Sequence, residues 1–192
     1  LHLCDYNLES IDTTSTTHKL LLEVCMAAYY EGDLIKTHYT QHKRTNEDSA
    51  SQLCTVLARS FADIGDIVRG RDLFLGYNEI DREQKKKIQD NLRKIFENIY
   101  NSLKDKEGAE TRYKDINDPD FFKLREDWWT ANRHTVWEAI TCNAGGGNRY
   151  FRQTCGGDEN TATEAKNKCR CSDKPNTDQV PTYFDYVPQF LR

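Results

Sequence analysis

Seven cysteines are spread along the whole chain, and they constrain its fold more than any other feature. So many cysteines in 192 residues are uncommon in a reducing compartment and typical of secreted or surface-displayed proteins. Because the count is odd, one thiol is free or has its partner outside this sequence. Cys4 stands near the start and is the natural orphan. We therefore expect a disulfide-stapled domain cut from a larger cysteine-rich protein.

The spacing of the apolar residues indicates an all-α bundle. Apolar side chains recur every three or four residues in four stretches, which is typical of amphipathic helices. Gly32 and Gly70 are expected to end the first two helices, although a further turn can follow Gly32, and Asp118–Pro119 caps the last. The predicted helices cover about residues 17–31, 53–68, 88–103 and 119–141. Four such helices with modest loops predict a helical bundle.

The remaining segments differ from the helices in composition. Residues 1–12 are expected to be an irregular leading segment. Residues 142–181 are rich in Cys and Gly and poor in aliphatic side chains, which predicts a long loop held by bridges and not by a core. Residues 181–192 carry an aromatic cluster between two prolines, and we expect this segment to dock on the bundle.

Six cysteines are predicted to form structural disulfides. Cys25 and Cys54 each lie on the apolar side of a predicted helix, and a bridge between them would contribute ~3–4 kcal/mol on the chain-entropy model. The other four could form two bridges in three ways. Free buried thiols are one alternative, and a zinc site of four thiolates is another. The cysteines predicted to be bridged are Cys25, Cys54, Cys142, Cys155, Cys169 and Cys171.

The densest run of basic residues is a candidate anion site. Lys85, Lys86 and Lys87, with Arg93 and Lys94 about two turns later, could bind a sulfated glycan by charge contacts. The alternative is a solvated helix face, because acidic residues at positions 81, 83 and 90 each stand four residues before a lysine. The predicted binding residues are Lys85, Lys86, Lys87, Arg93 and Lys94.

No catalytic, cofactor or metal motif stands out. Gly145–Gly147 lacks the lysine and strand of a phosphate loop, and no serine has the nucleophile-elbow frame. The pair His38 and His42 has no evident third ligand. A net charge of −4 gives no support to nucleic-acid binding. Trp128 and Trp129 are expected to pack in the core, with a binding hot spot as the alternative. The chain is therefore expected to bind a partner without enzymatic activity, cofactor or metal.

Five segments of the sequence carry a family resemblance: Ala58–Ile67, Asp72–Gly76, Leu124–Trp129, Trp137–Cys142 and Pro181–Arg192. In this order and spacing they resemble a Duffy-binding-like alpha domain of Plasmodium falciparum erythrocyte membrane protein 1. The likeness also extends upstream through Leu3–Ser10 and Glu23–Ala28, so it covers nearly the whole chain.

The resemblance implies a Duffy-binding-like fold and a place in a larger protein. Residues 1–12 would end a first subdomain, residues 13–192 would form the helical second one, and a third would be absent. Cys4 would then pair with an absent upstream cysteine. Display on the outer face of the infected erythrocyte is implied, with the membrane anchor outside this fragment. The implied function is rosetting or cytoadherence, through complement receptor 1, heparan sulfate or blood-group sugars, together with an antigenically variable surface that antibodies target.

Three hypotheses about partners follow. The fragment is an adhesion module for a sulfated glycan, or it recognises a protein receptor or an antibody through exposed loops. In the third hypothesis it is a structural subdomain whose receptor site lies in missing parts of the protein.

Overall fold

The computed structural model describes residues 6–43, 52–103, 105–106, 108–113, 117–156, 160–171 and 179–192. Helices dominate these ranges, as the apolar periodicity predicts, and the all-α fold class is confirmed. The helices are α1 (Tyr6–Glu9), α2 (Thr17–Lys43), α3 (Gln52–Arg69), α4 (Glu79–Leu103), α5 (Ala109–Tyr113) and α6 (Phe122–Ile140). Two short strands, β1 (Gln153–Cys155) and β2 (Thr163–Glu164), and two 3₁₀ turns, η1 (Phe184–Tyr186) and η2 (Gln189–Leu191), follow α6.

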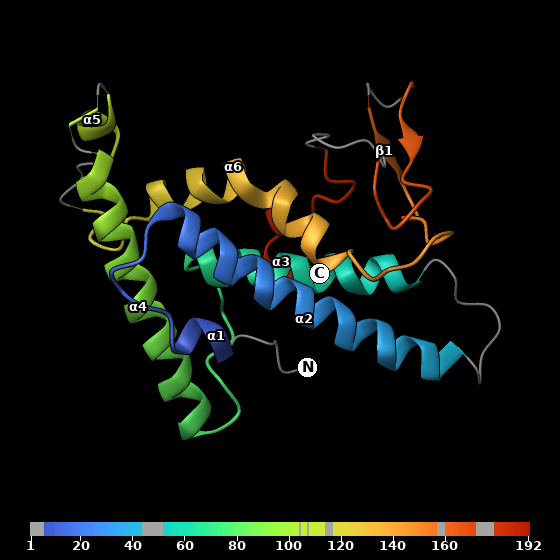
Figure 1. The fold of residues 1–192 in the computed structure, drawn as a ribbon, viewed down its shortest axis with the longest axis horizontal. Coiled ribbons are helices and arrows are strands. Elements are labelled where there is room, and N and C mark those ends of the chain that lie inside the picture. The colour runs from blue at the N-terminus through green and yellow to red at the C-terminus, as the bar shows by residue number, and fades with distance from the viewer. Residues whose placement is uncertain are drawn as a thin grey trace.

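Helices α2, α3 and α6 pack side by side, and α4 crosses one end of this layer (Figure 1). The tandem tryptophans of α6 join the two parts. Trp129 lies with its ring centroid 5.2 Å from that of Phe61 on α3, whereas Trp128 lies 6.1 Å from Phe96 on α4. Adjacent helical positions point about 100° apart, so each tryptophan meets a different neighbour. Both are buried, which confirms the predicted core role.

Gly32 lies inside α2 and does not end it. The predicted end of the first helix near residue 31 is therefore wrong, since α2 continues to Lys43. The reason for the glycine is tertiary: a Cβ atom at Gly32 would lie 2.0 Å from the backbone oxygen of Ile140 on α6. Glycine is therefore needed at residue 32 because two helix backbones meet there.

The disulfides join Cys54 to Cys169 and Cys155 to Cys171. The predicted bridge between Cys25 and Cys54 is wrong, because the bundle cysteine Cys54 is tied to the loop after α6 across 115 residues. Of the six cysteines predicted to be bridged, four are. Because Cys155, Cys169 and Cys171 are bridged, they are not free to be the thiolates of the zinc alternative.

Cys25 and Cys142 are free thiols, contrary to the prediction for both. Cys142 is exposed, and Cys25 is half-buried on α2. Burial raises the pKa of the Cys25 thiol to about 11, and the nearby Glu138 carboxylate adds to the shift. The predicted orphan, Cys4, lies outside the described residues.

The Cys- and Gly-rich loop is held by both disulfides, as predicted, but it also contributes to the core. Strands β1 and β2 pair antiparallel within it. Tyr150 and Ala165 are 2% and 0% exposed, and the indole N–H of Trp137 on α6 donates to the Cys169 oxygen at 3.1 Å. The expectation of a loop without a core is therefore wrong for these residues.

The C-terminal segment docks on α3 and α6, as predicted, and a buried carboxylate fixes it there. Asp185 in η1 accepts hydrogen bonds from the Trp129 indole at 3.0 Å and from Nε and Nη2 of Arg133 at 2.7 and 2.8 Å. Its side chain is 0% exposed. The Arg69 guanidinium from α3 donates to the Asp185 backbone oxygen.

Arg192 makes the second attachment of this segment. Its Nη2 pairs with Asp63 at 2.9 Å and with Asp66, both on α3, while Nη1 donates to the Phe184 and Val187 oxygens. The Arg192 side chain is only 4% exposed. We call Asp66, Arg69, Arg133, Asp185 and Arg192 the buried ionic cluster; Asp63 lies at its edge, with a side chain that is 37% exposed.

Candidate functional site

The candidate site begins where α3 ends. Gly70 adopts a left-handed conformation with φ 72°, and its N–H donates to the Ile67 oxygen at 3.2 Å. The N–H of Arg71 donates to the Asp66 oxygen at 2.8 Å, which completes a Schellman cap. The chain then leaves α3 and has no regular secondary structure over residues 71–76, before α4 begins. This turn opens a space between the end of α3, α4 and the start of α6.

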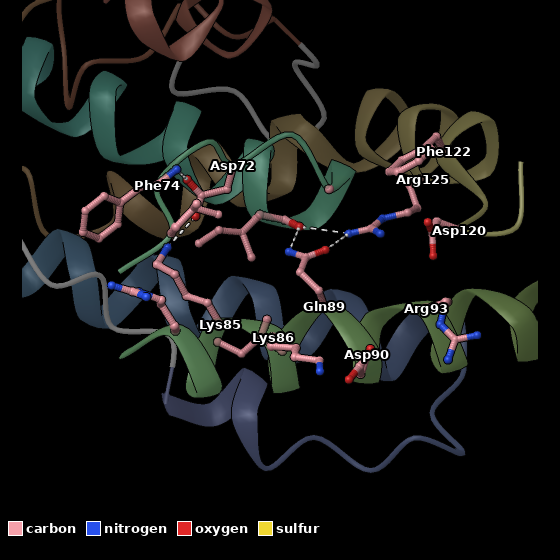
Figure 2. Close-up of a pocket in the computed structure, with 15 residues that line it drawn as sticks. Asp72, Phe74, Lys85, Lys86, Gln89, Asp90, Arg93, Asp120, Phe122 and Arg125 are labelled. Carbon is pink, nitrogen blue, oxygen red and sulfur yellow. Dashed lines mark hydrogen bonds and ion pairs between the residues drawn. The ribbon is translucent and has the colours of Figure 1, made fainter. Parts of the chain in front are cut away.

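That space is a groove with a volume of about 460 Å³. Figure 2 shows α4 along one side and the first turn of α6 at one end, with Phe74 at the other. The groove is bounded by both charged and apolar side chains. Its lining residues are Ile67, Gly70, Asp72, Phe74, Leu75, Arg82, Lys85, Lys86, Ile88, Gln89, Asp90, Arg93, Asp120, Phe122 and Arg125.

Arg125 of α6 is a buried cation in the lining, only 2% exposed. Its Nε donates to the Val68 oxygen at 2.6 Å, and its Nη2 donates to the Ile67 oxygen at 3.1 Å and to Gln89 Oε1 at 2.7 Å. The guanidinium therefore sits on the carbonyls at the end of α3, where the helix dipole favours a positive charge. Burial lowers the pKa of Arg125 to about 10, so it remains charged at neutral pH.

Lys85 is held by neighbours inside the molecule. Its ammonium pairs with Asp72, and it lies 4.9 Å from the centroid of the Phe74 ring. The expected pair with Asp81, four residues earlier on the helix, does not form. Lys85 therefore fixes the α3–α4 connection onto α4, and its charge is already compensated.

Arg82, Lys86 and Arg93 line the same groove and are exposed. Their spacing of four and seven residues puts them on one face of α4. Within the described residues, none of the three forms a side-chain hydrogen bond or an ion pair. These three cations are therefore available to an outside ligand.

Of the five residues predicted to bind anions, the structure brings Lys85, Lys86 and Arg93 to the groove and leaves two outside it. Lys87 and Lys94 are exposed on a different face of α4. The acidic residues expected to pair with them along the helix do not do so among the described residues.

The apolar part of the groove comes from three exposed side chains that the sequence reasoning did not single out as binding residues. Phe74, Leu75 and Phe122 are 39%, 74% and 45% exposed. The sequence reasoning also did not identify Arg125 as a site residue. Its spacing could have indicated it: Arg125 lies one helical turn before Trp128 and Trp129, which places a charged residue on the buried face of α6. We call Phe74, Leu75 and Phe122 the apolar rim.

The chain belongs to the Duffy binding domain family, whose model matches residues 1–192. It is similar to a solved ICAM-1-binding DBLβ domain of PfEMP1 variant IT4var13 from Plasmodium falciparum, with 29% identity and a TM-score of 0.69 over 99% of this chain and 39% of that one. The same domain bound to ICAM-1 matches with 29% identity and a TM-score of 0.68 over 99% and 40%. Another PfEMP1 DBLβ domain bound to human ICAM-1 matches with 27% identity and a TM-score of 0.55 over 90% and 30%.

This chain thus spans about two fifths of the first two solved chains that it matches. No curated protein matches it. The helices in the described ranges include none with both the length and the apolar character of a membrane span. The two disulfides fit an extracellular location.

Proposed function

We propose that this chain is a non-enzymatic adhesion module that binds a host-cell receptor, and that the groove is its contact site. The observation that carries the proposal is a set of exposed cations, unpaired within the described part of the chain, beside an apolar rim in an open groove. Arginine and aromatic side chains are the residue types that dominate binding energy at protein interfaces. The solved relatives that bind ICAM-1 support receptor binding as the general role.

The proposed subtype, subdomain boundaries, location and receptors rest on the sequence segments that resemble the alpha domains. They favour the alpha subtype of the Duffy-binding-like domains, with residues 1–12 from a first subdomain and the rest from a second. The proposed location is the outer face of the infected erythrocyte, where the chain acts in rosetting or cytoadherence and is a target of antibodies. Complement receptor 1 and blood-group sugars are the proposed receptors besides a sulfated glycan.

A pair of matched variants tests the groove. The double variant Lys86→Glu/Arg93→Glu reverses two groove charges, and Lys87→Glu/Lys94→Glu reverses two charges on the other face of the same helix. Binding of the oxidised, fluorescent chain to uninfected erythrocytes and endothelial cells is measured by flow cytometry. We expect the groove variant to lose about tenfold or more of its affinity and the control to keep it.

The other outcomes would separate the alternatives. Equal loss in both variants would indicate a diffuse charge effect and contradict the groove assignment. Absence of binding by the folded, unmodified chain would favour a structural subdomain whose receptor site lies in other parts of the protein.

A sulfated glycan is the second candidate ligand. It is favoured by one observation: Lys86, Lys87, Arg93 and Lys94 are all exposed and unpaired on α4 among the described residues. A polyanion that lies along the helix would contact both faces, so both double variants should elute from a heparin column at lower salt. Unchanged elution of the Lys87→Glu/Lys94→Glu variant would contradict this candidate.

A further inference from the structure

We infer that the groove recognises a polypeptide segment that carries acidic side chains and at least one large apolar side chain. This inference rests on the proposed function and names the class of ligand for the same site. It follows from the charge of the lining, the apolar rim and the fixed position of Arg125, which are taken in turn.

The charge of the lining favours a ligand with few negative charges. Lys85 and Asp72 neutralise each other. The remaining lining has four cations, Arg82, Lys86, Arg93 and Arg125, and two carboxylates, Asp90 and Asp120. A densely sulfated chain in the groove would meet these two carboxylates, and like charges in contact are unfavourable. A peptide can place one or two carboxylates against the cations and donate backbone N–H groups to Asp90 and Asp120.

The apolar rim requires an apolar partner. Phe74 and Phe122 lie at opposite ends of the groove, as Figure 2 shows, so a ligand that spans it meets an aromatic ring at either end. A sulfated sugar is polar over most of its surface, whereas an aromatic or long aliphatic side chain removes apolar surface from water on both partners. The apolar rim therefore favours a ligand that carries a large apolar side chain in addition to its negative charge.

Arg125 offers a fixed donor to the ligand carboxylate. Its Nε and Nη2 hold the backbone oxygens of α3 and Gln89, while Nη1 makes no hydrogen bond within the described residues. Gly70 leaves the space beside it open, because a Cβ atom there would lie 2.9 Å from Nη1. A guanidinium that is already ordered binds a carboxylate with less loss of side-chain entropy than a free surface arginine.

Selection from a random displayed-peptide library on the oxidised chain tests the ligand class. Counter-selection uses the triple variant Lys86→Glu/Arg93→Glu/Phe122→Ala, whose three substituted side chains are all exposed. Circular dichroism and disulfide mapping check that the variant is folded. We expect groove-dependent peptides enriched in Asp or Glu together with Phe, Tyr, Trp or Leu.

Synthetic versions of the selected peptides then separate the two requirements. Replacement of the acidic side chains by Asn or Gln, and of the apolar one by Ala, should each weaken binding about tenfold. Recovery of no groove-dependent peptides, or of peptides without acidic enrichment, would overturn the inference. So would a heparin oligosaccharide that competes only when the groove cations are intact and binds more tightly than any peptide.

Failure of the inference differs from failure of the proposed function. If Lys86→Glu/Arg93→Glu abolishes cell binding but the selection gives no acidic peptides, the groove remains the receptor site and the ligand class is wrong. If acidic, apolar peptides bind the groove but do not compete with cell binding, the ligand class holds and the receptor site lies elsewhere.

Discussion

The buried ionic cluster and the groove contain the same kinds of side chain, arranged in opposite ways. In the cluster, Asp185 and Arg192 are almost completely buried and bonded on several sides by α3 and α6. In the groove, Lys86 and Arg93 are exposed and unpaired among the described residues. The first arrangement fixes the C-terminal segment, and the second leaves charge free for a partner. Whether a charged side chain is paired and buried, and not how many charges lie nearby, therefore distinguishes a structural residue from a binding residue.

The largest effect should come from Asp185. The variant Asp185→Asn removes the negative charge that compensates Arg133, whose side chain is 12% exposed. It also replaces one of the two carboxylate oxygens by an NH2 group, which would face N–H donors of Arg133 or Trp129. Breaking a buried ion pair in this way costs ~3–5 kcal/mol of unfolding free energy. Urea denaturation of the oxidised chain measures it. The matched control, Asp90→Asn in the groove, should change stability by less than about 0.5 kcal/mol, and an equal effect of both would contradict the comparison.

The second effect should come from Gly70, which lines the groove and directly follows Arg69 of the buried ionic cluster. Gly70→Ala forces a non-glycine residue into a left-handed conformation, at a cost of about 1–2 kcal/mol. It also brings a Cβ atom within 2.8 Å of Phe122 and 2.9 Å of Arg125.

Gly108→Ala is the control for Gly70→Ala. Gly108 also has a left-handed φ, 81°, but a Cβ atom there would meet nothing within 4 Å. The backbone strain is therefore similar in both variants, and only Gly70→Ala should also weaken binding of receptor or selected peptide. A similar loss of binding in both variants would show that the groove does not depend on this glycine.

A pH effect should distinguish the buried cluster from exposed ion pairs. Burial raises the pKa of Asp63 and of Asp66, and their pairing with Arg192 only partly opposes this. The folded chain therefore takes up protons at these sites, and their contribution to stability is lost as the pH rises through the raised pKa values. The variant Asp66→Asn should accordingly gain stability relative to the parent chain as the pH goes from about 4 to 7.

Asp127 provides a contrast of opposite sign. Hydrogen bonds from Arg112 lower the pKa of the Asp127 carboxyl, so its stabilising contribution is present above the unfolded pKa and is lost as the pH falls. Asp127→Asn should therefore lose stability relative to the parent chain as the pH rises through this acidic range. Denaturation curves at several pH values for both variants check the signs, and slopes of the same sign would refute the assignment.

The sequence predicted the helices because their apolar periodicity is local, and it predicted the core role of Trp128 and Trp129 for the same reason. The prediction from sequence failed where a residue's role is determined by contacts with distant parts of the chain. Gly32 has the signature of a helix end, but its role is set by Ile140, more than a hundred residues later. The partner of Cys54 likewise depends on the path of the loop after α6.

The candidate site was predictable only in part, for a related reason. A run of lysines marks a basic stretch of helix, and three members of the predicted set, Lys85, Lys86 and Arg93, line the groove. The rest of the groove comes from the α3–α4 connection and the first turn of α6. The position of the groove depends on how α3, α4 and α6 pack against one another, and no local sequence pattern predicts this packing.

The smallest effect concerns two adjacent lysines that are equivalent in the sequence. Lys85 is paired with Asp72 and lies against Phe74, so Lys85→Gln should lower the unfolding free energy by about 1 kcal/mol. Lys86 has no such partner among the residues that the structure describes, and Lys86→Gln should change the unfolding free energy by less than about 0.5 kcal/mol. In binding the order should reverse, with the larger loss of affinity in Lys86→Gln. Both variants remove one positive charge, so a general charge effect would weaken binding equally in the two. Equal loss of affinity would therefore contradict the assignment of Lys85 as a structural residue and Lys86 as a binding residue.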